Sequence, residues 1–102
     1  MTIERKERGE TAYIHAEFRN LAGELADPTT SAKVSVWDKD GILKIDAAAM
    51  MKDAGTGKYH YGYPVPTDAA PDEDKAWTYR IEATSGDFVD YKLGYFKVVE
   101  AK

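Results

Sequence analysis

The sequence predicts an all-β protein of about seven antiparallel strands arranged in two packed layers. Apolar and polar residues alternate with period two in most of the chain, and turn residues interrupt this alternation at short intervals. No segment shows the strand–helix–strand alternation that is typical of a parallel sheet. We expect residues 1–102 to form a single domain, because this length and a hydrophobic content of 43% suffice for one core.

The N-terminal part predicts two strands followed by a loop. A short strand is expected over residues 2–8, and a longer one over Thr11–Arg19. The second strand has one apolar face, formed by Ala12, Ile14, Ala16 and Phe18. Residues 20–30 contain the glycine, aspartate and proline of a loop, from which we expect Leu21 and Leu25 to cover the edge of the core.

The middle of the chain predicts a hairpin and one ambiguous segment. Residues 32–37 alternate as a strand, Asp38–Gly41 has the Asp-Gly signal of a tight turn, and residues 42–45 continue as a short strand. Residues 46–52 are rich in alanine and methionine, which favour a helix, but the segment is short for a stable one. We favour a hairpin in which residues 49–53 pair with the following strand.

That following strand contains a tyrosine at every second position. It begins after the turn Gly55–Gly57, and Tyr59, Tyr61 and Tyr63 leave the backbone on one face. We expect Tyr59 and Tyr61 to lie largely in the core and Tyr63 to lie nearer its rim. Three prolines and several acids make residues 64–75 a surface loop.

The C-terminal part predicts two strands, at residues 76–84 and 88–99, joined by a turn at residues 85–87. The apolar residues of the last strand change parity along its length. Val89, Tyr91 and Leu93 share one parity, whereas Phe96 and Val98 share the other. Because a change of face requires an extra residue in the strand, we predict a β-bulge at Gly94.

Composition excludes several classes of protein. The formal charge of −4 and the pI of about 5.1 argue against nucleic acid as a partner, and no apolar run is long enough to insert into a membrane. The chain has no cysteine, which removes disulfides, thiolate metal sites and a cysteine nucleophile. The charged N-terminus, which starts with Met1, lacks the apolar run of a signal peptide, and this favours a short, complete gene product made in the cytoplasm.

Turn and core motifs along the chain resemble those of a known family. These are Gly9-Glu10-Thr11, Asp27-Pro28, Val34-x-Val36, Asp38-x-Asp40-Gly41, a methionine at position 51, Gly57-x-Tyr59-x-Tyr61, Pro64-x-Pro66, Trp77-x-Tyr79-x-Ile81-x-Ala83 and Phe96-x-Val98. Residues 9–99 resemble the immunoglobulin-like or macroglobulin-like β-sandwich domains of prokaryotic surface proteins and of tailed-phage and archaeal-virus genomes. Relatives have a glycine before the tryptophan, whereas this chain has Ala76 there. The resemblance implies an immunoglobulin-like antiparallel β-sandwich that acts as a spacer, an adhesion module or a virion component, without catalytic residues.

Trp37 is the first candidate for a binding residue. Its parity is opposite to that of Val34 and Val36, which places it on the outer face of its sheet. We expect Arg80 and Lys92, from neighbouring strands, to lie beside it and to form a cation–π contact. A tryptophan surrounded by polar residues is a good centre for a protein interface.

The outward-facing side of another strand gives a second set of candidates. His15 and His60 should be neighbours across two strands, with Glu17 nearby, and Tyr13 should be exposed on the same face. Two histidines and a carboxylate do not complete a zinc site, so we predict no metal site and no cofactor. Asp38–Gly41 is interpreted as a turn, because a calcium loop needs further oxygen ligands and a late glutamate.

No motif of enzyme chemistry is present. The serines do not stand in a Gly-x-Ser-x-Gly elbow, and Gly55–Gly57 is not followed by the Lys-Ser pair of a phosphate-binding loop. We therefore predict a non-enzymatic structural or protein-interaction module, homo-oligomeric or part of a larger symmetric assembly, such as a capsid, neck or tail protein of a virion. The alternatives are an extracellular adhesion or spacer domain of a cell-surface protein, and a carbohydrate-binding module that uses Trp37, Tyr13 and Phe88.

Overall fold

A computed structural model of the chain describes residues 4–72, 74–85 and 88–99. Over these residues the protein is all-β, without a helix. The strands are β1 (Glu4–Glu7), β2 (Thr11–Glu17), β3 (Ser31–Trp37), β4 (Leu43–Ala49), β5 (Met51–Lys52), β6 (Lys58–Pro64), β7 (Trp77–Ser85) and β8 (Phe88–Val99). The sequence predicts these strands well, including β5, which lies within the segment 49–53 expected to pair with the tyrosine strand. The exception is β4, which is longer than expected. Residues 86 and 87 of the predicted turn, and the residues before β1, fall outside the described part of the chain.

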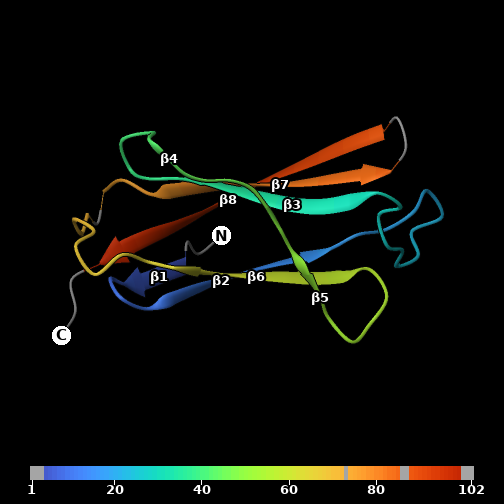
Figure 1. Ribbon diagram of the computed structural model, residues 1–102, viewed down its shortest axis with the longest axis horizontal. Coiled ribbons are helices and arrows are strands. Elements are labelled where there is room, and N and C mark those ends of the chain that lie inside the picture. Colours follow the sequence, from blue (N-terminus) through green and yellow to red (C-terminus); the bar gives the residue numbers. More distant parts are fainter. Residues whose placement is uncertain (1–3, 73, 86–87, 100–102) are drawn as a thin grey trace.

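The strands form two sheets that enclose one core. A five-stranded sheet has the order β1-β8-β7-β3-β4, and a three-stranded sheet has the order β2-β6-β5. Figure 1 shows β3 and β7 in one layer and β2 and β6 in the other. The buried apolar side chains come from both sheets, as with Ile14 of β2 and Val34 of β3, so the core lies between the layers. All pairs are antiparallel except that of β1 with β8, which is parallel.

The ambiguous alanine-rich segment carries the chain from one sheet to the other. It extends β4 up to Ala49, and β5 then pairs with β6 through Met51–His60 and Lys52–Tyr59, which confirms the predicted hairpin. The register of β4 against β3 shifts near Ala47, which has a positive φ of 52°. The buried hydroxyl of Ser35 accepts the amide hydrogen of Ala47 at 3.0 Å and so stabilises this irregularity.

The tyrosine row of β6 does face the core, but the predicted order of burial is wrong. Tyr63 is buried, whereas Tyr59 and Tyr61 are only half-buried. Tyr63 meets Trp77 and Phe96 of the opposite sheet at ring-centroid distances of 6.1 and 6.4 Å. The alternation of the strand specifies the face, but the position of large side chains on the opposite sheet decides which tyrosine is covered.

The predicted β-bulge at Gly94 is also wrong. β7 and β8 pair without a register shift from Trp77–Phe96 to Ser85–Phe88. Gly94 is needed for a different reason, because a Cβ atom there would overlap the Tyr79 ring that lies across it on the neighbouring strand. Since β8 keeps one phase throughout, the residues that share parity with Leu93 lie on the face opposite to Phe96.

The loop after β2 is attached by polar contacts of Asp27. This carboxylate accepts the Gly57 amide hydrogen at 2.7 Å and contacts the Lys52 ammonium at 2.6 Å. Of the two leucines predicted to cover the core edge, Leu25 is half-buried and forms a bridge with Arg19, whereas Leu21 is fully exposed. The prediction for Leu21 is therefore wrong, because the loop is held by hydrogen bonds and not by that side chain.

Asp27 is expected to make the stability of the fold depend on pH in the acidic range. The hydrogen bond from Lys52, followed by that from the Gly57 amide, lowers the pKa of Asp27 below its ordinary value. A lowered carboxyl pKa stabilises the folded state above the unfolded pKa of about 4, and this contribution is lost as the pH falls through the folded pKa. We expect the free energy of unfolding, measured with urea, to decrease on acidification below about pH 4, and to decrease less in Asp27→Asn.

Asp46→Asn is the matched control for this prediction. Asp46 is an exposed carboxylate for which the described residues provide no hydrogen bond or ion pair. Its replacement removes a carboxylate without removing a contact of this kind, so it measures the change in pH dependence that does not come from the contacts of Asp27. An equal change of slope in both variants would contradict the role given to Asp27.

Candidate interaction face

The outer face of the five-stranded sheet is the side directed away from the three-stranded sheet. Because directly paired residues share a face, the register assigns β8 residues to it unambiguously. Its members on β8 are an apolar stripe, defined as Val89, Tyr91, Leu93 and Tyr95, which pair with Thr84, Glu82, Arg80 and Thr78 of β7. On the far side of β7, Lys33, Ser35 and Trp37 of β3 pair with Glu82, Arg80 and Thr78.

The apolar stripe is open to solvent. The exposed fractions are 42% for Val89, 56% for Tyr91, 64% for Leu93 and 50% for Tyr95. Leu43, which pairs with Trp37 on the same sheet, is also exposed. Single exposed apolar residues are common, but a contiguous row of them on one strand marks a binding surface. The common parity of these residues in the sequence indicates the stripe. The predicted bulge at Gly94, which would bring the stripe to the same face as Phe96 and Val98, is what hides it, and that prediction is wrong.

Arg80 lies in the middle of the outer face between two aromatic rings. Its guanidinium carbon is 5.4 Å from the centroid of the Trp37 ring and 4.9 Å from that of Tyr91. The contact predicted between Trp37 and Arg80 is thus confirmed, and the partly covered Trp37 lies on the predicted face. Arg80 Nε is buried without a hydrogen-bond partner, and the residues that the structure describes supply no ion pair to this side chain.

The predicted position of Lys92 is wrong. Its parity in β8 directs it to the opposite side of the sheet from Trp37. There its ammonium donates to the Glu17 carbonyl oxygen at 2.6 Å and lies 5.6 Å from the centroid of the Phe18 ring. Lys92 therefore connects the end of β2 to the other sheet, and it does not contribute to the outer face.

The second predicted set lies on the outer side of the three-stranded sheet. His15 and His60 are directly paired in β2 and β6, with ring centroids 6.4 Å apart, which confirms that they are neighbours. His60 Nδ1 contacts the Asp53 carboxylate, and Tyr13 is exposed beside this pair. Within the described part of the chain, no three His, Asp or Glu side chains are grouped so that they could hold a metal ion.

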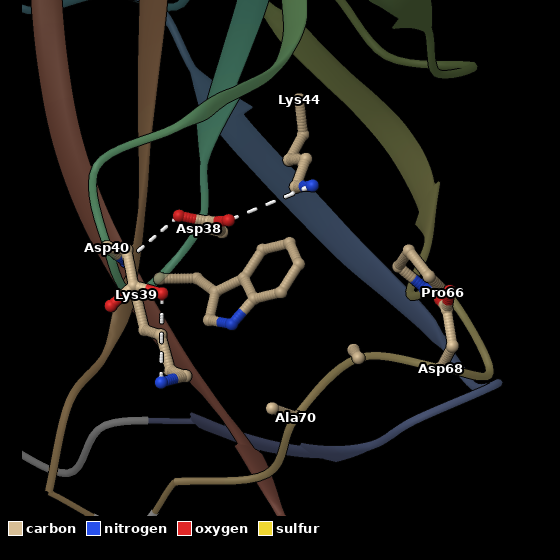
Figure 2. A pocket seen from close by; sticks show the side chains of 9 residues that line it. Asp38, Lys39, Asp40, Lys44, Pro66, Asp68 and Ala70 are labelled. Carbon is tan, nitrogen blue, oxygen red and sulfur yellow. Dashed lines mark hydrogen bonds and ion pairs between the residues drawn. The ribbon is translucent and has the colours of Figure 1, made fainter.

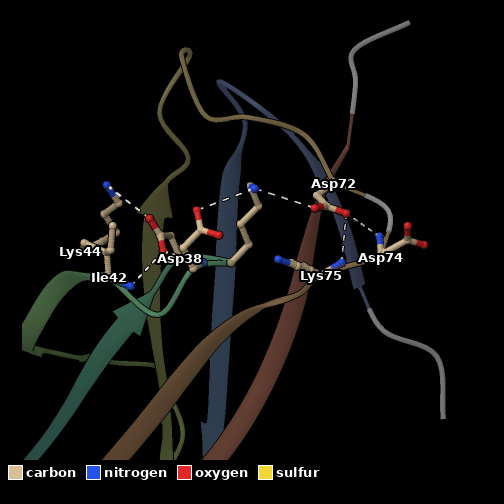
Figure 3. Close-up of polar contacts among 8 residues, drawn as sticks. Asp38, Ile42, Lys44, Asp72, Asp74 and Lys75 are labelled. Carbon is tan, nitrogen blue, oxygen red and sulfur yellow. Dashed lines mark hydrogen bonds and ion pairs between the residues drawn. The ribbon is translucent and has the colours of Figure 1, made fainter.

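A small cavity of about 190 Å³ lies beside the Asp38–Gly41 turn (Figure 2). It is lined by residues of this turn, by Lys44, by the loop after β6 and by Trp77. The oxygens of Asp38 are already engaged, since Oδ1 accepts the amide hydrogens of Asp40 and Ile42 at 2.9 Å and Oδ2 lies 3.7 Å from Lys44 Nζ. Figure 3 shows these contacts and the similar ones that Asp72 makes with the amides of Asp74 and Lys75.

These contacts support the interpretation of the segment as a turn. Partial desolvation raises the pKa of Asp38. The amides of Ile42 and Asp40, together with Lys44, lower this pKa by more, so the net shift is downward. The backbone amide of Asp74, opposed by some desolvation, lowers the pKa of Asp72. Both carboxylates therefore act as acceptors that close their own loops.

The chain has no match among protein-family models, curated proteins or solved structures. The described residues contain no helix that is long and apolar enough to cross a membrane. The exposed surfaces of the molecule therefore carry the information about its function. Among the described residues, the outer face combines an exposed apolar row with an arginine that has no ion pair, and it is the strongest candidate for a binding surface.

Proposed function

We propose that the protein is a non-enzymatic interaction module that binds another protein through the outer face of its five-stranded sheet. The exposed apolar stripe of β8, with Arg80 stacked beside it, is the observation that carries this proposal. Aromatic and arginine side chains dominate the binding energy of protein interfaces, particularly where they lie at the centre of an apolar patch. A partner that covers this face would remove the stripe from water and surround the stacked guanidinium.

We further propose an immunoglobulin-like β-sandwich as the specific fold. The order β8-β7-β3-β4 opposite β2-β6-β5 corresponds to the G-F-C-C′ and B-E-D order of that fold, with β1 as a first strand beside G. The inter-sheet aromatic cluster of Trp77, Phe96 and Tyr63 lies where such domains have their central packing. This topology leaves the outer side of the larger sheet available for a partner.

The proposal predicts where partner contacts are found. A photo-crosslinking phenylalanine analogue at Leu93, in protein expressed in its native source, should form discrete adducts with one reproducible partner peptide, identified by mass spectrometry. The same analogue at Tyr13, which is similarly exposed but lies on the other sheet, should form none. Absence of adducts at Leu93, or equal adducts at both positions, would refute the assignment of the interaction to this face.

Carbohydrate binding is the second candidate, and the structure adds an observation in its favour. Tyr91 and Tyr95 are exposed on one face of β8, and the partly covered Trp37 lies on the same face of the sheet, on the other side of β7. Tyr13 lies on the other sheet and cannot join this row, and the Phe88 side chain lies outside the described part of the structure. Retardation in gels that contain soluble polysaccharides, abolished by Tyr91→Ala, would favour this function.

We propose a virion component as the biological setting, with a cell-surface adhesion or spacer domain as the alternative. A small module that binds through one face suits an assembly in which symmetry repeats a modest contact many times. Genomic neighbours distinguish the settings: terminase, portal or tail genes beside this one support a virion protein. Tandem copies of the domain in one reading frame support a surface protein.

A further inference from the structure

Two opposite charges lie side by side at the centre of the outer face. Arg80 and Glu82 are two residues apart on β7 and therefore point to the same side of the sheet. On β8, Leu93 pairs with Arg80 and Tyr91 pairs with Glu82, so both charges border the apolar stripe. Among the residues that the structure describes, neither charge has an ion-pair partner.

Such a pair is self-complementary. In a two-fold symmetric interface, residue i contacts residue j of the partner, and j contacts i in return. A two-fold axis that lies in the interface plane, across β7 at the level of Ile81, places two β7 strands antiparallel and face to face. Arg80 of each copy then stands opposite Glu82 of the other, since each is one residue from the axis.

The same axis also aligns the apolar stripes. Because it runs across the strands, it brings β8 over β8 and β3 over β3 of the second copy. The level of Ile81 corresponds to Lys92 in the β8 register, so Leu93 stands opposite the other copy's Tyr91. By the same count Tyr95 stands opposite Val89. One operation therefore buries the exposed row against itself and gives each central charge its opposite.

The third strand is also compatible with this arrangement. The level of Ile81 corresponds to Val34 in β3, so Lys33 stands opposite Ser35 of the other copy and does not meet a second lysine. Two sheets that pack face to face with aligned strands are a standard arrangement, about 10 Å apart. The three central strands can thus face their copies across one axis without placing like charges directly opposite one another.

We propose that the occupant of the outer face is a second copy of this chain, in a symmetric dimer in which Arg80 of each protomer pairs with Glu82 of its partner. This inference rests on the proposed function, since it names the partner of the same face. The stacking of Arg80 on Trp37 and Tyr91 holds the guanidinium in place before the dimer forms. The terminal nitrogens of the guanidinium then donate to the partner's Glu82 carboxylate, a contact that the described residues of a single copy do not provide.

Sedimentation of the full chain over roughly 10 to 500 µM tests the proposal, because dimerisation depends on concentration. The wild-type chain should change from monomer to dimer over this range. Arg80→Glu and Glu82→Arg each place like charges opposite one another and should weaken dimerisation at least ~10-fold. An equimolar mixture of the two variants should associate again, because one copy then presents two acids and the other two bases.

Several outcomes would overturn the proposal. The first is a wild-type chain that stays monomeric at the highest concentration. The second is a mixture of the two charge variants that stays monomeric. The third is a dimer that is abolished by Leu93→Asp but unaffected by both charge reversals. Circular dichroism of each variant confirms that it is folded. Adducts between Leu93 and a different protein, together with a monomeric wild-type chain, would exclude the dimer and leave the proposed function standing.

Discussion

Replacing Gly57 by alanine is expected to destabilise the folded protein by about 3 kcal/mol or more. Gly57 has a φ of +76°, in the left-handed region that L-residues rarely adopt. A Cβ atom there would lie 2.7 Å from the Phe18 carbonyl oxygen and 2.9 Å from the Ala26 nitrogen. Because both contacts are with backbone atoms, a side-chain rotation cannot relieve the clash. The loop after β2, which Asp27 holds against Gly57, must therefore shift.

Gly41→Ala is the matched control for this substitution. Gly41 has a φ of +82°, but a Cβ atom there would meet nothing within 4 Å. Its replacement should cost only the left-handed strain, about 1–2 kcal/mol. Urea denaturation of both variants measures the difference, which isolates the clash. Equal losses of stability would show that the approach of Phe18 and Ala26 to Gly57 is not tight.

Replacing Phe96 by alanine is the second substitution with a large expected effect. Phe96 is 1% exposed, and it meets Trp77 and Tyr63 at centroid distances of 5.7 and 6.4 Å between the sheets. Removing the ring loses its transfer from water and leaves a cavity among rigid aromatic neighbours. We expect a loss of about 3–5 kcal/mol in the free energy of unfolding.

Leu93→Ala tests the same strand on its other face. Leu93 is exposed on the outer face, so its replacement should change stability by less than about 0.5 kcal/mol at protein concentrations where the chain is monomeric. If a bulge at Gly94 placed Leu93 in the core, the same substitution would reduce the free energy of unfolding by about 2–5 kcal/mol. Urea denaturation of the two variants therefore decides the phase of β8 directly.

The sequence by itself determined most strands and several local contacts. In β2 a run of small and apolar residues alternates with polar ones, so one face could only be buried. The Asp-Gly turn carries its own acceptors in Asp38. Parity and strand order were enough to place His15 beside His60, and Arg80 beside Trp37, because side chains on neighbouring strands of a sheet meet at predictable positions.

Only the tertiary structure decided which apolar face of β8 is covered. Both faces carry large apolar residues, and period-two alternation defines two faces without saying which one meets the other sheet. The opposite sheet covers Phe96, and no described segment covers Leu93. The same cause explains why the depth of Tyr63 and the direction of Lys92 were mispredicted. Burial depends on what lies across the interlayer space, and the local pattern of one strand does not contain that information.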